Sequence, residues 1–279
     1  MTARKNVTLL FFAAMLAADA QWLNYPAPGT PRTKDGKPNL SAKTPRLAGK
    51  PDLSGVWQVQ PEVKGEIERM LGKDAIAVDV VPGDDITTFS RYFYNILADF
   101  KPEEAPLRPE ATAIMRARPK DTESPSIRCL PLGVTRAELI GFPFKIVQTP
   151  GLIVMMFEND NTRRQIYTDG RKLPDNPNPA WLGYSVGHWE GETLVVDSAG
   201  FNEKIWIDAF GHPVSESLHV QERFLRRDFG HMDLQITVDD PKMFTKPFTF
   251  KVTQLLLPDS DILENFCAEN EKDRPHMRR

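Results

Sequence analysis

The sequence predicts a mainly β protein whose antiparallel strands close into a barrel carrying a small helical insertion. From Phe144 onward, apolar and polar residues alternate with a period of two, as half-buried strands do. Short turns join these segments, which favours a meander, and closing a meander into a barrel removes its exposed edges. Twenty-four prolines against seventeen glycines indicate many ordered loops. A β-sandwich is the alternative architecture.

The first twenty residues have the features of a secretory signal peptide. Arg4 and Lys5 precede an apolar run over 7–18, and Ala18-Asp19-Ala20 fits the small-x-small cleavage pattern. Such a run makes a helix of roughly 18 Å, too short for a hydrocarbon core of about 30 Å. We therefore predict cleavage after Ala20, a soluble periplasmic or secreted product, and no membrane span. A buried N-terminal helix is the alternative.

The composition of the mature chain limits the partners that it can bind and indicates how the chain is divided. Without residues 1–20 the formal net charge moves from −3 to −4, since Arg4, Lys5 and Asp19 are lost. No basic stripe of the kind that binds nucleic acid is present. We expect an extended Pro-rich arm over 21–50, one barrel domain over 51–273 and a charged tail over 274–279. The oligomeric state is left open.

The first strand is expected at 53–59, and the insertion that follows it at 61–118. Apolar residues at helical spacing predict helices at 61–71, 87–100 and 108–118, the second with an aromatic face that packs on the sheet. A further strand over 75–81 is possible on the same alternation. The later strands are expected at 144–148, 152–158, 162–168, 183–189, 192–199, 218–227, 231–239, 248–257 and 262–267.

Two cysteines remain after cleavage, Cys129 and Cys267. In an oxidising compartment an isolated pair most often forms a disulfide, and this one would close a loop of nearly 140 residues. The alternatives are two buried thiols or a reactive thiol activated by a neighbouring cation.

Two resemblances bear on the fold. Leu53-Ser54-Gly55-Val56-Trp57 resembles the Gly-x-Trp signature of lipocalins and the wider calycin barrels, in which the Trp closes one barrel end. The family's later Thr-Asp-Tyr and Arg signatures are not evident, and the insertion is a departure. This resemblance implies a calycin-like barrel that binds small, mainly apolar molecules.

The stretch from Arg128 to Asp273 resembles a family of secreted proteins of environmental bacteria. That resemblance implies export and a β fold. It implies no mechanism, because no activity is settled for the family. It is carried by the runs CLPLG (129–133), IYTDGR (166–171), GYSVGHWEGETLVVDSAGFN (183–202), GHP (211–213), FGH (229–231) and CAENE (267–271).

Polar residues inside apolar alternations are the candidate site residues. Glu222 shares a face with Leu218, Val220 and Phe224, and the same pattern puts Glu264 and His188 on the inner face of their segments. A His and carboxylates in an apolar cup suffice for proton transfer, and an inward Glu without a cation would have its pKa raised. A one-residue slip would instead place all of them in solvent.

Loop and edge residues add further candidates. Asp208 precedes His212 by four residues in a loop, where an Asp can orient an imidazole for general-base work or form a simple Asx turn. Arg163 and Arg164 face opposite ways in a strand, so at most one reaches an internal ligand; the alternative is two solvated edge charges. The residues expected to bind ligand are Tyr184, Trp189, Glu264, Tyr167 and Arg164, and those expected to act as acid or base are His188, Glu222, Asp208 and His212.

Several function classes lack support in the sequence. No His or Cys spacing indicates a metal site, and no nucleophile elbow, Walker loop or dinucleotide fingerprint is present, so no metal and no cofactor are expected. The function predicted is therefore binding of a small, mainly apolar molecule in the barrel cavity. The alternative is a cofactor-free enzyme on the same barrel, an isomerase, hydratase, lyase or hydrolase that uses the His and Glu or Asp groups. A structural or surface-interaction role is the third possibility.

Overall fold

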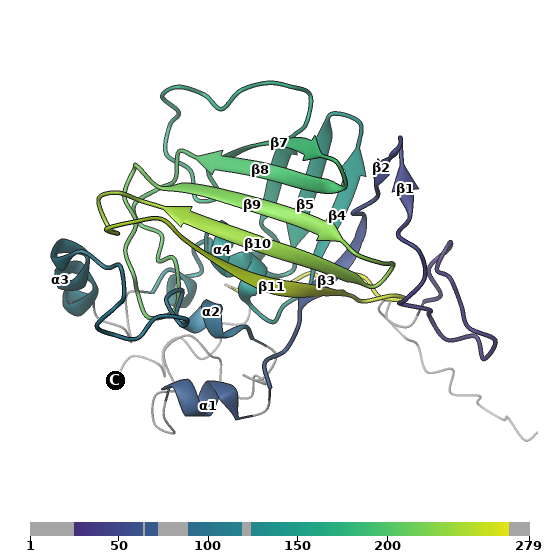
Figure 1. Cartoon of the computed structure of the whole chain (residues 1–279), viewed down its shortest axis with the longest axis horizontal. Helices are drawn as coiled ribbons and strands as arrows, with labels where there is room; N and C mark the ends of the chain where they lie inside the picture. The colour runs from purple at the N-terminus through teal and green to yellow at the C-terminus, as the bar shows by residue number, and fades with distance from the viewer. Residues whose placement is uncertain (1–24, 64, 72–88, 119–123, 268–279) are drawn as a thin grey trace, which may run out of the picture.

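The computed structural model describes residues 25–63, 65–71, 89–118 and 124–267, and its main feature is a closed barrel of nine strands (Figure 1). The strands follow one another around the barrel as β10-β11-β3-β4-β5-β6-β7-β8-β9, with β9 paired to β10. This confirms the predicted mainly β barrel. The barrel strands are β3 (Gly55–Val59), β4 (Phe144–Thr149), β5 (Leu152–Phe157), β6 (Arg163–Tyr167), β7 (Tyr184–Glu190), β8 (Thr193–Ala199), β9 (His219–Arg226), β10 (His231–Asp239) and β11 (Phe248–Leu256).

The barrel interior is filled by the chain's own side chains. Alternate positions are buried on β9 and β10, as the period of two requires. At one end Trp57 is fully buried, donates from Nε1 to the carbonyl of Leu53 at 2.9 Å and lies under the guanidinium of Arg226, 4.9 Å from its ring centre. The inward residues that pack together include Phe144, Ile146, Ile153, Met155, Phe157, Ile166, Leu194, Val196, Val220, Phe224, Leu234, Ile236 and Val238.

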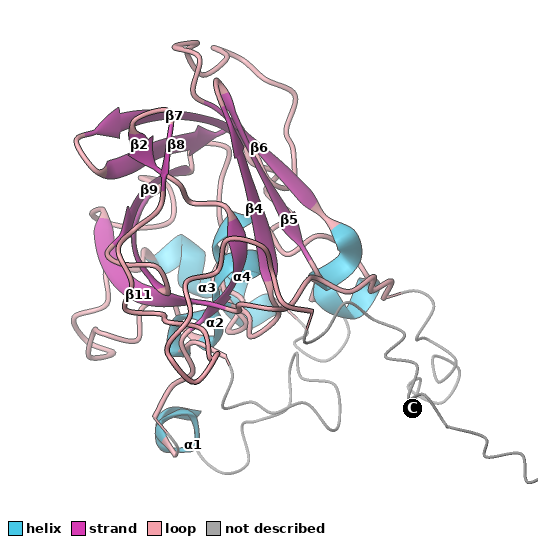
Figure 2. Ribbon diagram, turned by 90° about the vertical axis from the view of Figure 1, so that its right-hand side faces the viewer, coloured by secondary structure: helices cyan, strands magenta, loops and turns pink. Residues whose placement is uncertain are grey.

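Short helices lie at one end of the barrel, and one lies inside it. α4 sits within the ring of strands in both views (Figures 1 and 2), and all six of its residues are buried. It was not predicted. The expected helix over 87–100 is much shorter, because Asn95 adopts an extended conformation and its side chain accepts from the Leu97 amide. The helices are α1 (Glu66–Leu71), α2 (Arg91–Tyr94), α3 (Pro109–Ala117) and α4 (Val134–Leu139), with 3-10 turns at Ser126–Arg128 and Asn159–Asn161.

The expected aromatic face of the insertion packs on the sheet. The rings of Tyr92 and Phe250 are 4.4 Å apart, and those of Phe100 and Phe248 are 6.1 Å apart. The suggested strand over 75–81 and the signal-peptide segment lie outside the described residues.

The contact between β6 and β7 differs from every other contact in the barrel, because it is parallel. It joins only two residue pairs, Ile166 with Ser185 and Tyr167 with Val186. Parallel neighbours need a long crossover, and here residues 168–183 supply it without a helix. We call this segment the β6–β7 connection; it rises above the barrel at the top of Figure 1.

The arm and the C-terminal segment both lie against the barrel. A two-residue hairpin, β1 (Arg46–Leu47) with β2 (Lys50–Pro51), follows an arm that is tied to the C-terminal segment by Arg32 and Asp259. The strand predicted over 262–267 is wrong. This segment has no ladder partner because side chains satisfy its backbone: Glu158 accepts from the Leu263 amide at 2.9 Å.

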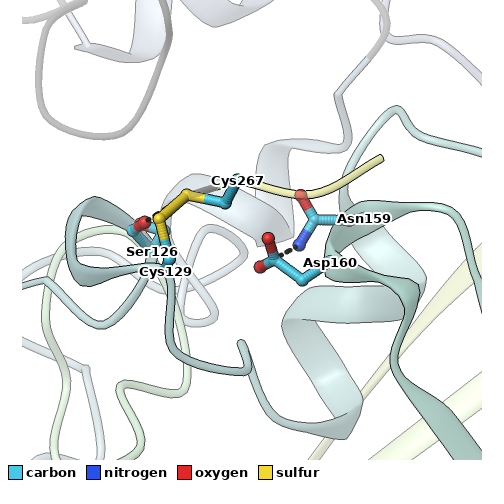
Figure 3. Close-up of a disulfide and its surroundings, with 5 residues drawn as sticks. All are labelled: Ser126, Cys129, Asn159, Asp160 and Cys267. Carbon is cyan, nitrogen blue, oxygen red and sulfur yellow. Dashed lines mark hydrogen bonds between the residues drawn. A yellow bond between two sulfur atoms is a disulfide. The ribbon is translucent and has the colours of Figure 1, made fainter. Parts of the chain in front are cut away.

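A disulfide between Cys129 and Cys267 fixes this C-terminal segment, as the cysteine count predicted. The bond lies beside the turn that carries Asn159 and Asp160 (Figure 3). Asp160 accepts the backbone amide of Cys267; burial raises the pKa of this carboxyl, and the hydrogen bond partly offsets the rise.

Candidate functional site

The predicted site residues of β7 lie mostly on the opposite face from the one expected. Ser185 and Gly187 are buried, whereas Tyr184 and His188 are exposed on the outside of the barrel. His188 bonds Glu190 at 3.2 Å with more than half of its side chain in solvent. The expectation that Tyr184 and His188 face the interior is therefore wrong by one residue of register. Trp189 is the exception, since it packs against the core.

Glu222 does point into the barrel, as predicted, but the partners expected for it are elsewhere. It is fully buried on β9, opposite Val196 of β8. Glu264 is exposed on the C-terminal segment, outside any strand, so its predicted inward position is wrong. The structure therefore does not bring His188, Glu222 and Glu264 together.

The partner of Glu222 is Arg164, at the centre of a buried polar cluster. Arg164 Nη1 donates to Glu222 Oε1 at 2.8 Å and to Glu138 Oε1 at 2.9 Å, and Nη2 also contacts Glu222 Oε2. Its Nε donates to Ser185 Oγ at 3.0 Å, and Nη2 donates to Ser198 Oγ at 2.8 Å. We call these five residues the Arg164 cluster; they come from β6, α4, β9, β7 and β8.

The Arg164 cluster holds two carboxyl groups against one cation. Burial, and then the neighbouring Glu222, raise the pKa of Glu138 well above its ordinary value. Burial alone would lower the pKa of Arg164, but the two carboxyl groups outweigh it and raise the pKa. The cluster thus places two carboxyl groups beside one guanidinium inside the barrel, and this arrangement favours the protonated form of Glu138.

Sequence reasoning did not single out Glu138. Its signal was present: Arg136 and Glu138 are two charged residues inside an otherwise apolar segment between Leu132 and Ile140. Both are fully buried. Burial of long charged side chains requires partners, and that requirement could have linked this segment to the inward Glu222.

A surface pocket of about 610 Å³ lies on the outer side of β6 and β7, under the β6–β7 connection. It brings together three residues predicted to bind ligand: Tyr167, Tyr184 and Arg164. We call it the β6–β7 pocket. Its lining residues are Arg163, Arg164, Gln165, Tyr167, Arg171, Lys172, Pro174, Leu182, Gly183, Tyr184, Ser185 and Val186.

The connection that covers this pocket is anchored at both ends. Near its start, Arg171 pairs with Asp169 and stacks on the Tyr167 ring, 3.7 Å from its centre. Near its end, the Ala180 amide donates to the carbonyl of Gly200 at 3.0 Å. Pro177 lies against Gly200 as well. A pocket held in this way is largely formed before a ligand arrives.

A second pocket, of about 670 Å³, lies between the arm and the C-terminal segment. Its charged residues are already matched: Lys145 pairs with Asp261 at 2.7 Å, and Asp259 pairs with Arg32. Arg226, buried over Trp57, donates to backbone carbonyls there, and burial lowers its pKa to about 10. These ion pairs and hydrogen bonds hold the arm and the C-terminal segment together around this pocket.

The predicted Asp208 and His212 pair does form. His212 Nδ1 lies 2.5 Å from Asp208 Oδ2, and both side chains are buried. Asp208 also accepts the backbone amides of Ile96 and His212, so it holds its loop against the end of α2. Neither residue lines the two pockets described above.

Within the described residues, no group of three or more His, Cys, Asp or Glu side chains is arranged to hold a metal ion. Of the helices in the described part of the chain, none is long and apolar enough to cross a membrane. The sequence matches no protein-family model and none of the curated proteins. The candidate site is therefore defined by the geometry of the closed nine-stranded barrel alone.

Proposed function

We propose that this protein is exported and binds a small organic molecule in the β6–β7 pocket. The observation that carries the proposal is the pocket itself: a preformed hollow of about 610 Å³, which is the size range of small-molecule sites. It combines apolar walls with convergent polar groups, and three residues expected to bind ligand line it. The Cys129–Cys267 disulfide supports export, because disulfides persist in oxidising compartments.

The proposal moves the ligand from the inside of the barrel to its outside. The interior positions carry fully buried side chains that pack on one another, and the buried guanidinium of Arg164 is bonded by Glu222 and Glu138. The calycin-like resemblance is then consistent with the barrel and with the buried Trp57. The proposed ligand site differs from that of calycins, because the β6–β7 connection forms it.

The acid–base alternative ranks second. It depends on the Asp208–His212 pair, in which the carboxylate orients the imidazole as a general base requires. We place it second because a substrate needs a pocket, and the two residues line neither of those described.

A matched pair of variants tests the proposal. Val186 lines the β6–β7 pocket, and Val186→Trp would fill it. Leu225 is a half-exposed outward residue of β9 that lines neither pocket, so Leu225→Trp is the control. In a saturation-transfer NMR screen of small organic fragments, we expect binders that are lost in Val186→Trp and kept in Leu225→Trp. A screen without binders, or binders indifferent to Val186→Trp, would overturn the proposal.

A further inference from the structure

The charges around the β6–β7 pocket are unbalanced. Its lining includes four cations and no carboxylate. Two of these cations are already matched, Arg164 by Glu222 and Glu138, and Arg171 by Asp169. In the described part of the chain, Arg163 and Lys172 line the pocket without an ion pair. Unmatched cations that line one concave surface create a positive potential that attracts anions.

Arg163 and Arg164 receive opposite environments from the same strand. Arg164 is buried with its carboxylate partners, whereas the Arg163 side chain stands on the outer face of β6. A guanidinium presents parallel N–H donors that fit the two oxygens of a carboxylate. Lys172, an exposed residue of the β6–β7 connection, supplies a second point charge to the lining of the same pocket.

The remaining walls suit a flat ring. Tyr184 lines the pocket and is 38 % exposed. Leu182, Val186 and Pro174 add apolar surface. Aromatic side chains bind planar groups through offset or edge contacts, and a pocket of this volume accommodates a ring of one or two cycles.

We propose that the ligand of the β6–β7 pocket is an organic acid that joins a carboxylate to a flat ring. The carboxylate lies between Arg163 and Lys172, and the ring lies against Tyr184. This inference rests on the proposed function, because it names the class of molecule that the same pocket takes.

The experiment compares 2-naphthoate with its neutral isostere 2-naphthamide by isothermal titration calorimetry. We expect 2-naphthoate to bind at least about tenfold more tightly, because a charge-assisted hydrogen bond to carboxylate contributes that factor or more. The variant Arg163→Gln/Lys172→Gln should abolish the preference. Lys251→Gln, which removes an exposed cation of β11 outside both pockets, should preserve it.

The outcomes separate the two proposals. Equal binding of both probes that is lost in Val186→Trp would keep the proposed function and overturn the acid ligand. A preference for 2-naphthoate that survives Arg163→Gln/Lys172→Gln would also overturn it, since the anion would bind elsewhere. Failure of 2-naphthoate to bind overturns the acid ligand, and an empty fragment screen would then overturn the proposed function too.

Discussion

Arg163 and Arg164 are adjacent in the sequence, but they lie on opposite faces of β6 and have different environments. Arg164 is buried, and five hydrogen bonds to Glu222, Glu138, Ser185 and Ser198 satisfy it. Arg163 stands on the wet outer face without an ion pair in the described part of the chain. The interior charge holds elements of the barrel together, and the outer charge is available for a ligand.

The largest effect expected from this comparison is the loss of the interior cation. Arg164→Met leaves carboxyl groups buried without their cation, and we expect the free energy of unfolding to fall by about 3–5 kcal/mol. Arg163→Gln should change it by less than about 0.5 kcal/mol. Urea unfolding of both variants provides the measurement. Similar losses of unfolding free energy in Arg164→Met and Arg163→Gln would contradict the different roles assigned to the two arginines.

A companion variant distinguishes lost pairing from damaged packing. If Arg164, Glu138 and Glu222 are all replaced by apolar residues of similar volume, no charge is left unpaired, and we expect most of the lost stability to return. A triple variant no more stable than Arg164→Met would mean that the stability is lost through damaged packing and not through unpaired charges.

The next effect is a pH dependence carried by Glu138. Because its pKa is raised in the folded protein, the native state keeps a proton that the unfolded chain releases above its ordinary pKa of 4.5. The stability that this group contributes is complete below 4.5 and is lost as the pH rises through the folded pKa. Glu138→Gln stays neutral throughout.

The difference in unfolding free energy between Glu138→Gln and the natural chain should therefore shift in favour of the variant as pH rises. The shift is at most about 1.4 kcal/mol per pH unit for one proton. Urea unfolding at pH 5, 6, 7 and 8 measures it, and titrating groups outside the Arg164 cluster cancel in the difference. A difference that is constant with pH would show that Glu138 is ionised in the native state.

The smallest effect concerns Gly200, which lies against the pocket residue Tyr184. Gly200 has a φ of +75°, and a Cβ there would lie 2.5 Å from Pro177 Cγ and 3.0 Å from Tyr184 Cδ2. Gly170, in the β6–β7 connection, has a φ of +85° with nothing within 4 Å. Gly170→Ala should therefore show the backbone cost alone, about 1–2 kcal/mol.

Gly200→Ala should cost more than Gly170→Ala, and it should also weaken 2-naphthoate binding, because Pro177 and Tyr184 must shift. Paired unfolding and calorimetric titrations check both statements. Equal costs, with affinity unchanged, would mean that this contact does not shape the pocket.

The sequence predicted the barrel because its strands carry a strict period of two and short turns, and that signal is local. It predicted the inward position of Glu222 for the same reason. On β7 the period was recognised but its phase was not: Ser185 and Gly187 are small, and Tyr184 and His188 were read as the inner face. The small inward residue Ser185 is explained by its hydrogen bond with the buried Arg164, and this contact cannot be read from the sequence of β7.

The outer pocket was not predictable from the sequence, and Tyr167, Tyr184 and Arg164, which line it, were expected to bind a ligand inside the barrel. It depends on the parallel contact of β6 with β7, and two hydrogen-bonded residue pairs leave no recognisable pattern in the sequence. The Asp208–His212 pair was predictable because four residues separate its members. Glu138 was missed because its partner lies 26 residues away on another element.

The Cys129–Cys267 bond also determines how the molecule would carry a mechanical load. The covalent ring that it closes contains β4 to β11, eight of the nine barrel strands, and leaves out only β3. A force applied along the chain passes directly from Cys129 to Cys267 and bypasses those eight strands. Pulling can peel away the arm, β3 and the insertion, but the rest of the barrel unravels only after the bond is reduced.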